Sequence, residues 1–217
     1  MASSIAAQPL LEVTDLACRR GSRPVLDHLS FGLAAGELLA LTGRNGSGKT
    51  TLLRALAGLV RPDAGTICWR GEDVAADPDT WRSRLAWLGH LDGLKGDLTV
   101  CENLETSERL RGGDAARLDG ALPDVLGAFD LGPLAARPVR TLSAGQRRRT
   151  ALARVVFTAA PLWLLDEPLN ALDAPAQTAF RTALQKHLAG GGLAIAATHA
   201  ELGVAGRTLE LAAEVAT

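Results

Sequence analysis

Three short hydrophobic runs in the sequence predict buried strands. Each run leads directly into polar or glycine-rich residues; the runs are Leu38–Thr42, 162–165 and Leu193–Ala197. Continuous apolar runs of this length are typical of parallel strands that are covered on both faces. Because ligands of such sheets gather beyond the carboxyl ends of the strands, the polar residues that follow these runs are candidates for a binding site.

Helical patterns alternate with these strands. Apolar residues recur at helical spacing in three segments, 49–59, 146–158 and 175–188. Near the N-terminus, 10–18 and 24–33 are expected to form strands of a partly antiparallel layer. Strand patterns vanish between about 98 and 138, where 99–110 and 115–131 are expected to be helices. The sequence therefore predicts an α/β fold with a mixed sheet, an N-terminal antiparallel β layer and an inserted α-helical lobe.

Composition favours a globular protein of one domain. The chain has 217 residues, 47% of them hydrophobic, and a formal net charge of -1. A nucleic-acid-binding protein would more often carry a basic excess, so no nucleic-acid partner is expected. No apolar run approaches the roughly 18–20 residues that span a bilayer, and the N-terminus lacks the pattern of a signal peptide. The three cysteines are scattered without a CxxC motif, which gives no support to structural zinc or covalent haem.

One glycine-rich segment has the pattern of a phosphate-binding loop. It follows a predicted strand, opens a predicted helix and reads Gly43, Arg44, Asn45, Gly46, Ser47, Gly48, Lys49, Thr50. Glycines let the backbone amides surround phosphate groups, and the start of the helix favours negative charge. Lys49 can reach the outer phosphates of ATP, and the Thr50 hydroxyl can bind Mg²⁺. The alternative is a glycine-rich turn with a chance lysine, which the flanking strand and helix disfavour.

Two acidic residues end the second buried run. Asp166, directly after the strand, can hold Mg²⁺ through water, and Glu167 can polarise an attacking water. An acidic helix cap would give the same local pattern. The phosphate loop earlier in the chain favours the interpretation as a catalytic pair.

A third motif makes the resemblance to a known family specific. Ser143, Ala144, Gly145 and Gln146 match the LSGGQ signature of ABC transporter nucleotide-binding subunits, with alanine in place of one glycine. The order of phosphate loop, signature, Asp-Glu pair and histidine also matches, over nearly the whole chain. We interpret the arginines that follow the signature, 147–149, as a solvated basic face of a helix.

The resemblance implies a P-loop NTPase (RecA-like) core and a working pair of subunits. It implies a single ABC ATPase domain over residues 1–217, with the core at about 1–90 and 139–217 and the lobe at about 91–138. In a homodimer, each signature would cover the ATP bound to the opposite subunit. The ATP contacts would extend to Thr51, Asp173 would lie in the loop that links the two sites, and His199 would hold the attacking water near the γ-phosphate.

The chain departs from the family at the residue that stacks on adenine. The family places an aromatic side chain in the turn between the first two strands, but this sequence has no tyrosine and carries Arg19 and Arg20 there. Because a guanidinium plane can stack on a base, Arg20 is our candidate for the adenine contact. Two solvated turn arginines are an equally open alternative.

His90 stands where the family carries a glutamine that contacts the Mg²⁺ and water site. The surrounding pattern, LGHLDGLKGDLTVCENL, resembles the haem-exporter ATPases of cytochrome c maturation. That branch implies a membrane subunit like CcmB, working with CcmC-, CcmD- and CcmE-like proteins, and a peripheral position on the cytoplasmic face of the bacterial inner membrane. The ATPase itself is not expected to bind haem. An exporter of another cargo, or a soluble ABC ATPase, are the alternatives.

Overall fold

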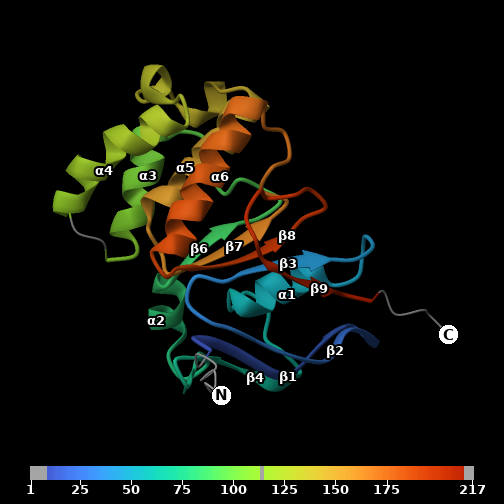
Figure 1. Cartoon of the computed structure of the whole chain (residues 1–217). Coiled ribbons are helices and arrows are strands. Elements are labelled where there is room, and N and C mark those ends of the chain that lie inside the picture. Colours follow the sequence, from blue (N-terminus) through green and yellow to red (C-terminus); the bar gives the residue numbers. More distant parts are fainter. Residues whose placement is uncertain (1–8, 113–114, 213–217) are drawn as a thin grey trace, which may run out of the picture.

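The computed structural model describes residues 9–112 and 115–212. They include two separate β-sheets, which lie one above the other in Figure 1. The first sheet is antiparallel, with the order β2-β1-β4-β5. Its strands are β1 (Leu11–Arg20), β2 (Arg23–Leu33), β4 (Ala64–Trp69) and β5 (Glu72–Asp73). The second sheet is parallel, with the order β6-β7-β8-β3-β9. Its strands are β3 (Leu38–Thr42), β6 (Leu85–Leu88), β7 (Leu162–Asp166), β8 (Leu193–Ala197) and β9 (Arg207–Glu210).

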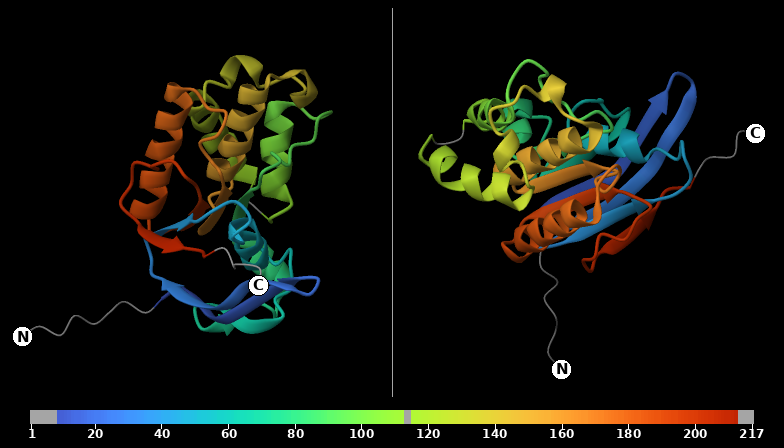
Figure 2. Two further views of the ribbon diagram at one scale, coloured as in Figure 1. Left: turned by 90° about the vertical axis from the view of Figure 1, so that its right-hand side faces the viewer. Right: turned by 90° about the horizontal axis from the view of Figure 1, so that it is seen from above.

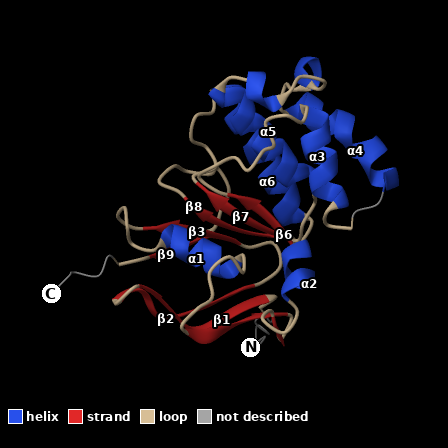
Figure 3. Cartoon of the chain, turned by 180° about the vertical axis from the view of Figure 1, so that it is seen from behind, coloured by secondary structure: helices blue, strands red, loops and turns tan. Residues whose placement is uncertain are grey.

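Alternating side chains of the parallel strands build two separate hydrophobic cores. In β7, Leu162 and Leu164 point to the core that faces the antiparallel sheet, whereas Trp163 and Leu165 point to the opposite core. Helix α1 (Lys49–Leu56) fills the space between the two sheets, and α5 (Ala144–Phe157) and α6 (Ala174–Ala189) cover the other face of the parallel sheet (Figure 3). Both faces of β7 and β8 are therefore buried, as the unbroken apolar runs predict.

Two further helices, α3 (Val100–Arg109) and α4 (Ala115–Ala128), lie beside α5, away from the antiparallel sheet (Figure 2). A capping box starts α3, in which Thr99 Oγ1 accepts from the Glu102 N–H and Glu102 accepts from the Thr99 N–H. The buried Asn103 side chain accepts from the Lys95 N–H at 2.8 Å and donates to the Lys95 carbonyl at 3.0 Å. These bonds fix the segment through which the chain enters the helical region.

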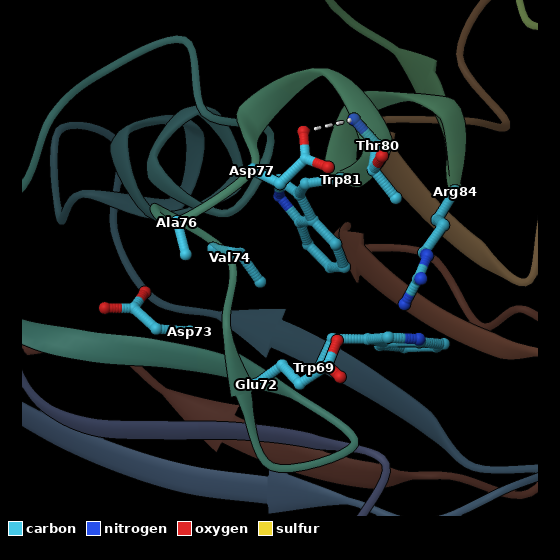
Figure 4. A pocket seen from close by; sticks show the side chains of 9 residues that line it. All are labelled: Trp69, Glu72, Asp73, Val74, Ala76, Asp77, Thr80, Trp81 and Arg84. Atoms are coloured by element: carbon cyan, nitrogen blue, oxygen red, sulfur yellow. Dashed lines mark hydrogen bonds between the residues drawn. The ribbon is translucent and has the colours of Figure 1, made fainter.

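The short helix α2 (Pro78–Ser83) joins the antiparallel sheet to β6. It is anchored by the buried Trp81, whose Nε1–H donates to the Leu56 carbonyl at 2.8 Å and whose ring lies 5.7 Å from that of Trp69. A pocket of about 220 Å³ lies beside these rings, and the acidic residues Glu72, Asp73 and Asp77 are among those that line it (Figure 4). Across the described ranges, no helix combines the length and the apolar character that crossing a membrane requires.

The predicted fold class is confirmed. The antiparallel and parallel parts of the structure belong to separate sheets, because α1 lies between them. Strands β4, β5 and β9 and helix α2 were not among the predicted elements. These elements are short and most of their residues are exposed, so they give a weaker periodic pattern than the central strands.

Candidate active site

Four neighbouring parallel strands end at one edge of the sheet, and the predicted site residues follow those ends. The order β6-β7-β8-β3 brings together His90, Asp166 with Glu167, Thr198 with His199, and the glycine-rich loop from Gly43. Because all four strands run in the same direction, segments more than 100 residues apart meet at this edge.

The loop between β3 and α1 has a backbone that only glycine adopts with ease. Gly43, Gly46 and Gly48 have φ values of 127°, 83° and 98°. A Cβ atom on Gly43 would lie 2.3 Å from the Leu211 carbonyl oxygen and 2.8 Å from the Ser47 hydroxyl. The first and last glycines of the motif are therefore required by close packing, because a Cβ on Gly48 would also lie 2.9 Å from the backbone of β2.

The loop folds around its own lysine. Lys49 is 9% exposed, and its ammonium group donates to the carbonyl oxygens of Gly43, at 2.6 Å, and Arg44, at 3.1 Å. Among the described residues, the buried Ser47 hydroxyl is one of few buried side-chain groups without a hydrogen-bond partner. An unpaired buried donor beside a buried cation suits a bound phosphate group, so the residues present fit the phosphates of ATP.

The Thr50 hydroxyl donates to Asp166 Oδ2 at 3.0 Å, although the two residues are 116 positions apart. Asp166 is 6% exposed at the end of β7. A hydroxyl and a carboxylate side by side are oxygen ligands of the kind that Mg²⁺ takes together with substrate phosphates and water. This donor set fits a magnesium ion.

The other predicted residues of the loop differ in exposure. Arg44, Asn45 and Gly46 lie exposed at the tip of the loop, and Thr51 is partly buried one residue further along α1.

The Glu167 carboxylate lies beside the His199 ring. His199 Nε2 is 3.9 Å from Glu167 Oε1, and the two side chains are 57% and 24% exposed. Glu167 has a positive φ of 48°, and its N–H donates to the Ala197 carbonyl at 2.8 Å. A positive φ at a non-glycine residue is a strained conformation, and such strained residues cluster at functional sites.

The signature residues form the start of α5. Ser143 caps the helix by accepting from the Gln146 N–H at 3.2 Å, and Gln146 Oε1 accepts from the Ser143 N–H at 2.9 Å. Ser143 and Ala144 are exposed, and Gly145 lies against the Ala171 carbonyl. Asp173 likewise caps α6 by accepting from the Ala176 N–H at 3.1 Å.

The interpretation of the arginines after the signature as a solvated face is wrong. Arg148 is only 6% exposed, and its guanidinium contacts the ends of β6 and β7. Arg147 donates to the Leu142 carbonyl, whereas Arg149 pairs with the exposed Asp130. Three consecutive arginines gave no sign of which one is buried, because that depends on how α5 lies against the sheet.

Two further candidates lie on exposed segments. His90 follows β6 on an exposed bend, and Arg20 is the exposed last residue of β1, in the hairpin whose second strand packs against Gly48. A cavity of about 630 Å³ lies beside the site and is lined by Thr42, Thr198 and His199, among others. None of the predicted site residues lines the pocket near Trp81 (Figure 4).

The contrast between two loop glycines yields a prediction. We expect Gly43→Ala to destabilise the fold more than Gly46→Ala, because a Cβ on Gly46 meets nothing within 4 Å. The excess loss in free energy of unfolding should be about 1–3 kcal/mol, as for an overpacked site. Urea denaturation of both variants measures this difference. Equal losses would contradict the packing role assigned to Gly43.

Comparisons with known proteins identify the family of the chain. Residues 26–170 match the family model described as ABC transporter. The cytochrome c biogenesis ATP-binding export protein CcmA of Rhodopseudomonas palustris (strain BisB5) is 48% identical over 91% of this chain and 96% of its own length. CcmA of Nitrosococcus oceani is 46% identical over 95% and 94%. A solved ATP-binding subunit of an ABC transporter, 29% identical, superposes with a TM-score of 0.82 over 88% of this chain and 80% of its own. The chain therefore belongs to the ABC transporter ATPase family, and it is similar to the CcmA proteins within it.

Proposed function

We propose that the chain is the ATP-binding and ATP-hydrolysing subunit of an ABC transporter complex that serves haem export or haem-chaperone release in c-type cytochrome biogenesis. The observation that carries the ATPase assignment is the meeting of Lys49, the Thr50–Asp166 pair and the Glu167–His199 pair at one sheet edge. The similarity to CcmA proteins over more than nine-tenths of the chain supports the biological role.

Each site residue has a definite chemical task in this proposal. The amides of residues 43–51 and the Lys49 ammonium bind the phosphates and stabilise the charge that develops during transfer. Thr50, Asp166 and His90 would hold Mg²⁺, which would neutralise phosphate charge. Glu167 accepts a proton from the attacking water, and the His199 ring orients that water. Arg20 is the proposed contact to adenine.

The signature supports pairing of two chains. The exposed start of α5 presents the positive end of a helix, which suits an oxyanion. We propose that each chain of a homodimer presents Ser143, Ala144, Gly145 and Gln146 to the ATP of the other chain, with Asp173 between the two sites. The segment 91–138 acts as the lobe that transmits closure, and 1–90 with 139–217 acts as the ATPase core.

A membrane partner completes the proposal. The chain is proposed to lie on the cytoplasmic face of the bacterial inner membrane, bound to a CcmB-like subunit and working with CcmC-, CcmD- and CcmE-like proteins. An exporter of a different cargo is the second candidate, because the ATPase site itself contains no cargo-specific chemistry.

Removal of the proposed base separates binding from hydrolysis. We expect Glu167→Gln to bind ATP as the unchanged chain does, while its turnover falls by about 10²-fold or more, as for loss of general base catalysis. ATP affinity and phosphate release of the purified chain measure the two quantities. Glu201→Gln, which alters an exposed acid two residues after His199, is the matched control. Normal hydrolysis by Glu167→Gln would refute the assignment.

The cytochrome role predicts a phenotype. Deletion of the gene should abolish assembly of c-type cytochromes, and the unchanged chain, but not Glu167→Gln, should restore it. Haem staining of membrane and periplasmic fractions measures this. Affinity purification from membranes should recover a small multi-span protein with the chain. Normal cytochromes with a recovered membrane partner would point to an exporter of another cargo.

A further inference from the structure

Arg148 lies in the second turn of α5 and reaches back under the active site. Its guanidinium is buried, with 6% of the residue exposed, and it donates to four oxygen atoms. One nitrogen donates to the Gly89 carbonyl and to Asp92 Oδ1, both at 3.2 Å. The other donates to the Asp166 carbonyl at 3.0 Å and to the Glu167 carbonyl at 2.5 Å. A single side chain therefore joins the signature helix to the ends of β6 and β7.

The acceptors lie on the two segments that carry the proposed site residues. Gly89 and Asp92 flank His90 in the loop after β6. The two carbonyls on β7 belong to the magnesium ligand Asp166 and the base Glu167. Since Glu167 holds a strained positive φ of 48°, a charged donor on its carbonyl oxygen helps to fix the orientation of this residue.

Arg154, further along the same helix, holds the rest of the loop. Its guanidinium donates to the carbonyls of Gly93 at 2.6 Å, Asp92 at 3.0 Å and Trp87 at 3.3 Å. Burial lowers the pKa of Arg154, and the nearby Asp92 carboxylate opposes this shift. Two arginines of α5 thus bind the segment 87–93. Of these two, Arg148 also donates to carbonyl oxygens at the end of β7, and these three hydrogen bonds of Arg154 do not reach that strand.

We propose that Arg148, with Asp92 as its charged acceptor, is a positioning residue that holds the His90 loop and the Glu167 backbone in one rigid arrangement with the signature helix. The inference rests on the proposed ATPase function. A guanidinium fork can bridge two segments because its donors lie in a fixed plane, whereas an ammonium group supplies charge without that geometry. If the exposed start of α5 binds ATP and the helix moves, Arg148 would then displace the Glu167 backbone and the His90 loop together.

The test compares kcat and KM for ATP in variants of the full chain, purified with its membrane partner where the two co-purify. We expect Arg148→Lys to lower kcat about tenfold and Arg148→Ala about 10²-fold, with KM for ATP within about twofold, because misplacement of a base by about 1 Å has effects of this size. Asp92→Asn should lower kcat in the same direction by a smaller factor. In Arg148→Ala, Asp92→Asn should add nothing further, because the two side chains act as a pair.

Arg149 supplies the matched control, because it carries the same charge one residue later and pairs with the exposed Asp130. Arg149→Ala and Asp130→Asn should leave kcat within about twofold of the unchanged chain. Should Arg148→Ala fail to fold, Arg148→Lys and Asp92→Asn decide the question. If both hydrolyse ATP at the control rate, or if only their KM changes, the inference is overturned. If the unchanged chain and the Arg149 control do not hydrolyse ATP, the proposed function itself fails.

Discussion

The shared direction of four adjacent strands is the constraint on which the candidate active site depends. Only in a parallel sheet do β6, β7, β8 and β3 deliver their carboxyl ends to the same edge, and their polar residues come from positions as far apart as 43 and 199. Burial on both faces holds these strands in place, because alternate side chains belong to two different cores. The hydrogen bond between Thr50 and Asp166 is a direct product of this arrangement.

The buried Arg148 guanidinium also links segments at that edge of the sheet. Removing the Arg148 charge from water costs free energy, which is offset only if the guanidinium is paired and its donors are used. One carboxylate and three carbonyls accept from the two terminal nitrogens of the guanidinium, whereas its buried Nε–H has no partner among the described residues. The same helix that begins with the signature therefore contributes to the geometry of the site within its own chain.

The central elements, and the position of the candidate site residues at one edge of the sheet, could be predicted from the sequence because their signals are strong and local. The phosphate loop, Asp166 with Glu167 and the signature each combine a periodic element with a short motif, and the family and fold predictions are confirmed. The burial of Arg148 could not be predicted, since it depends on where α5 crosses the sheet. The edge strand β9 was missed because its four residues are nearly all exposed. The adenine contact of Arg20 stays a prediction.

Ala144 affects the conformational order of the signature segment. It is the first residue of α5, inside the capping box, so the backbone there does not call for the glycine usual in the family. Alanine favours the helix over glycine by about 0.8–1.0 kcal/mol in helix interiors, chiefly because glycine loses more backbone freedom. The capping box and this alanine both favour an ordered helix start within the single chain. In the proposed homodimer, association would therefore spend less conformational entropy on ordering this end of the helix.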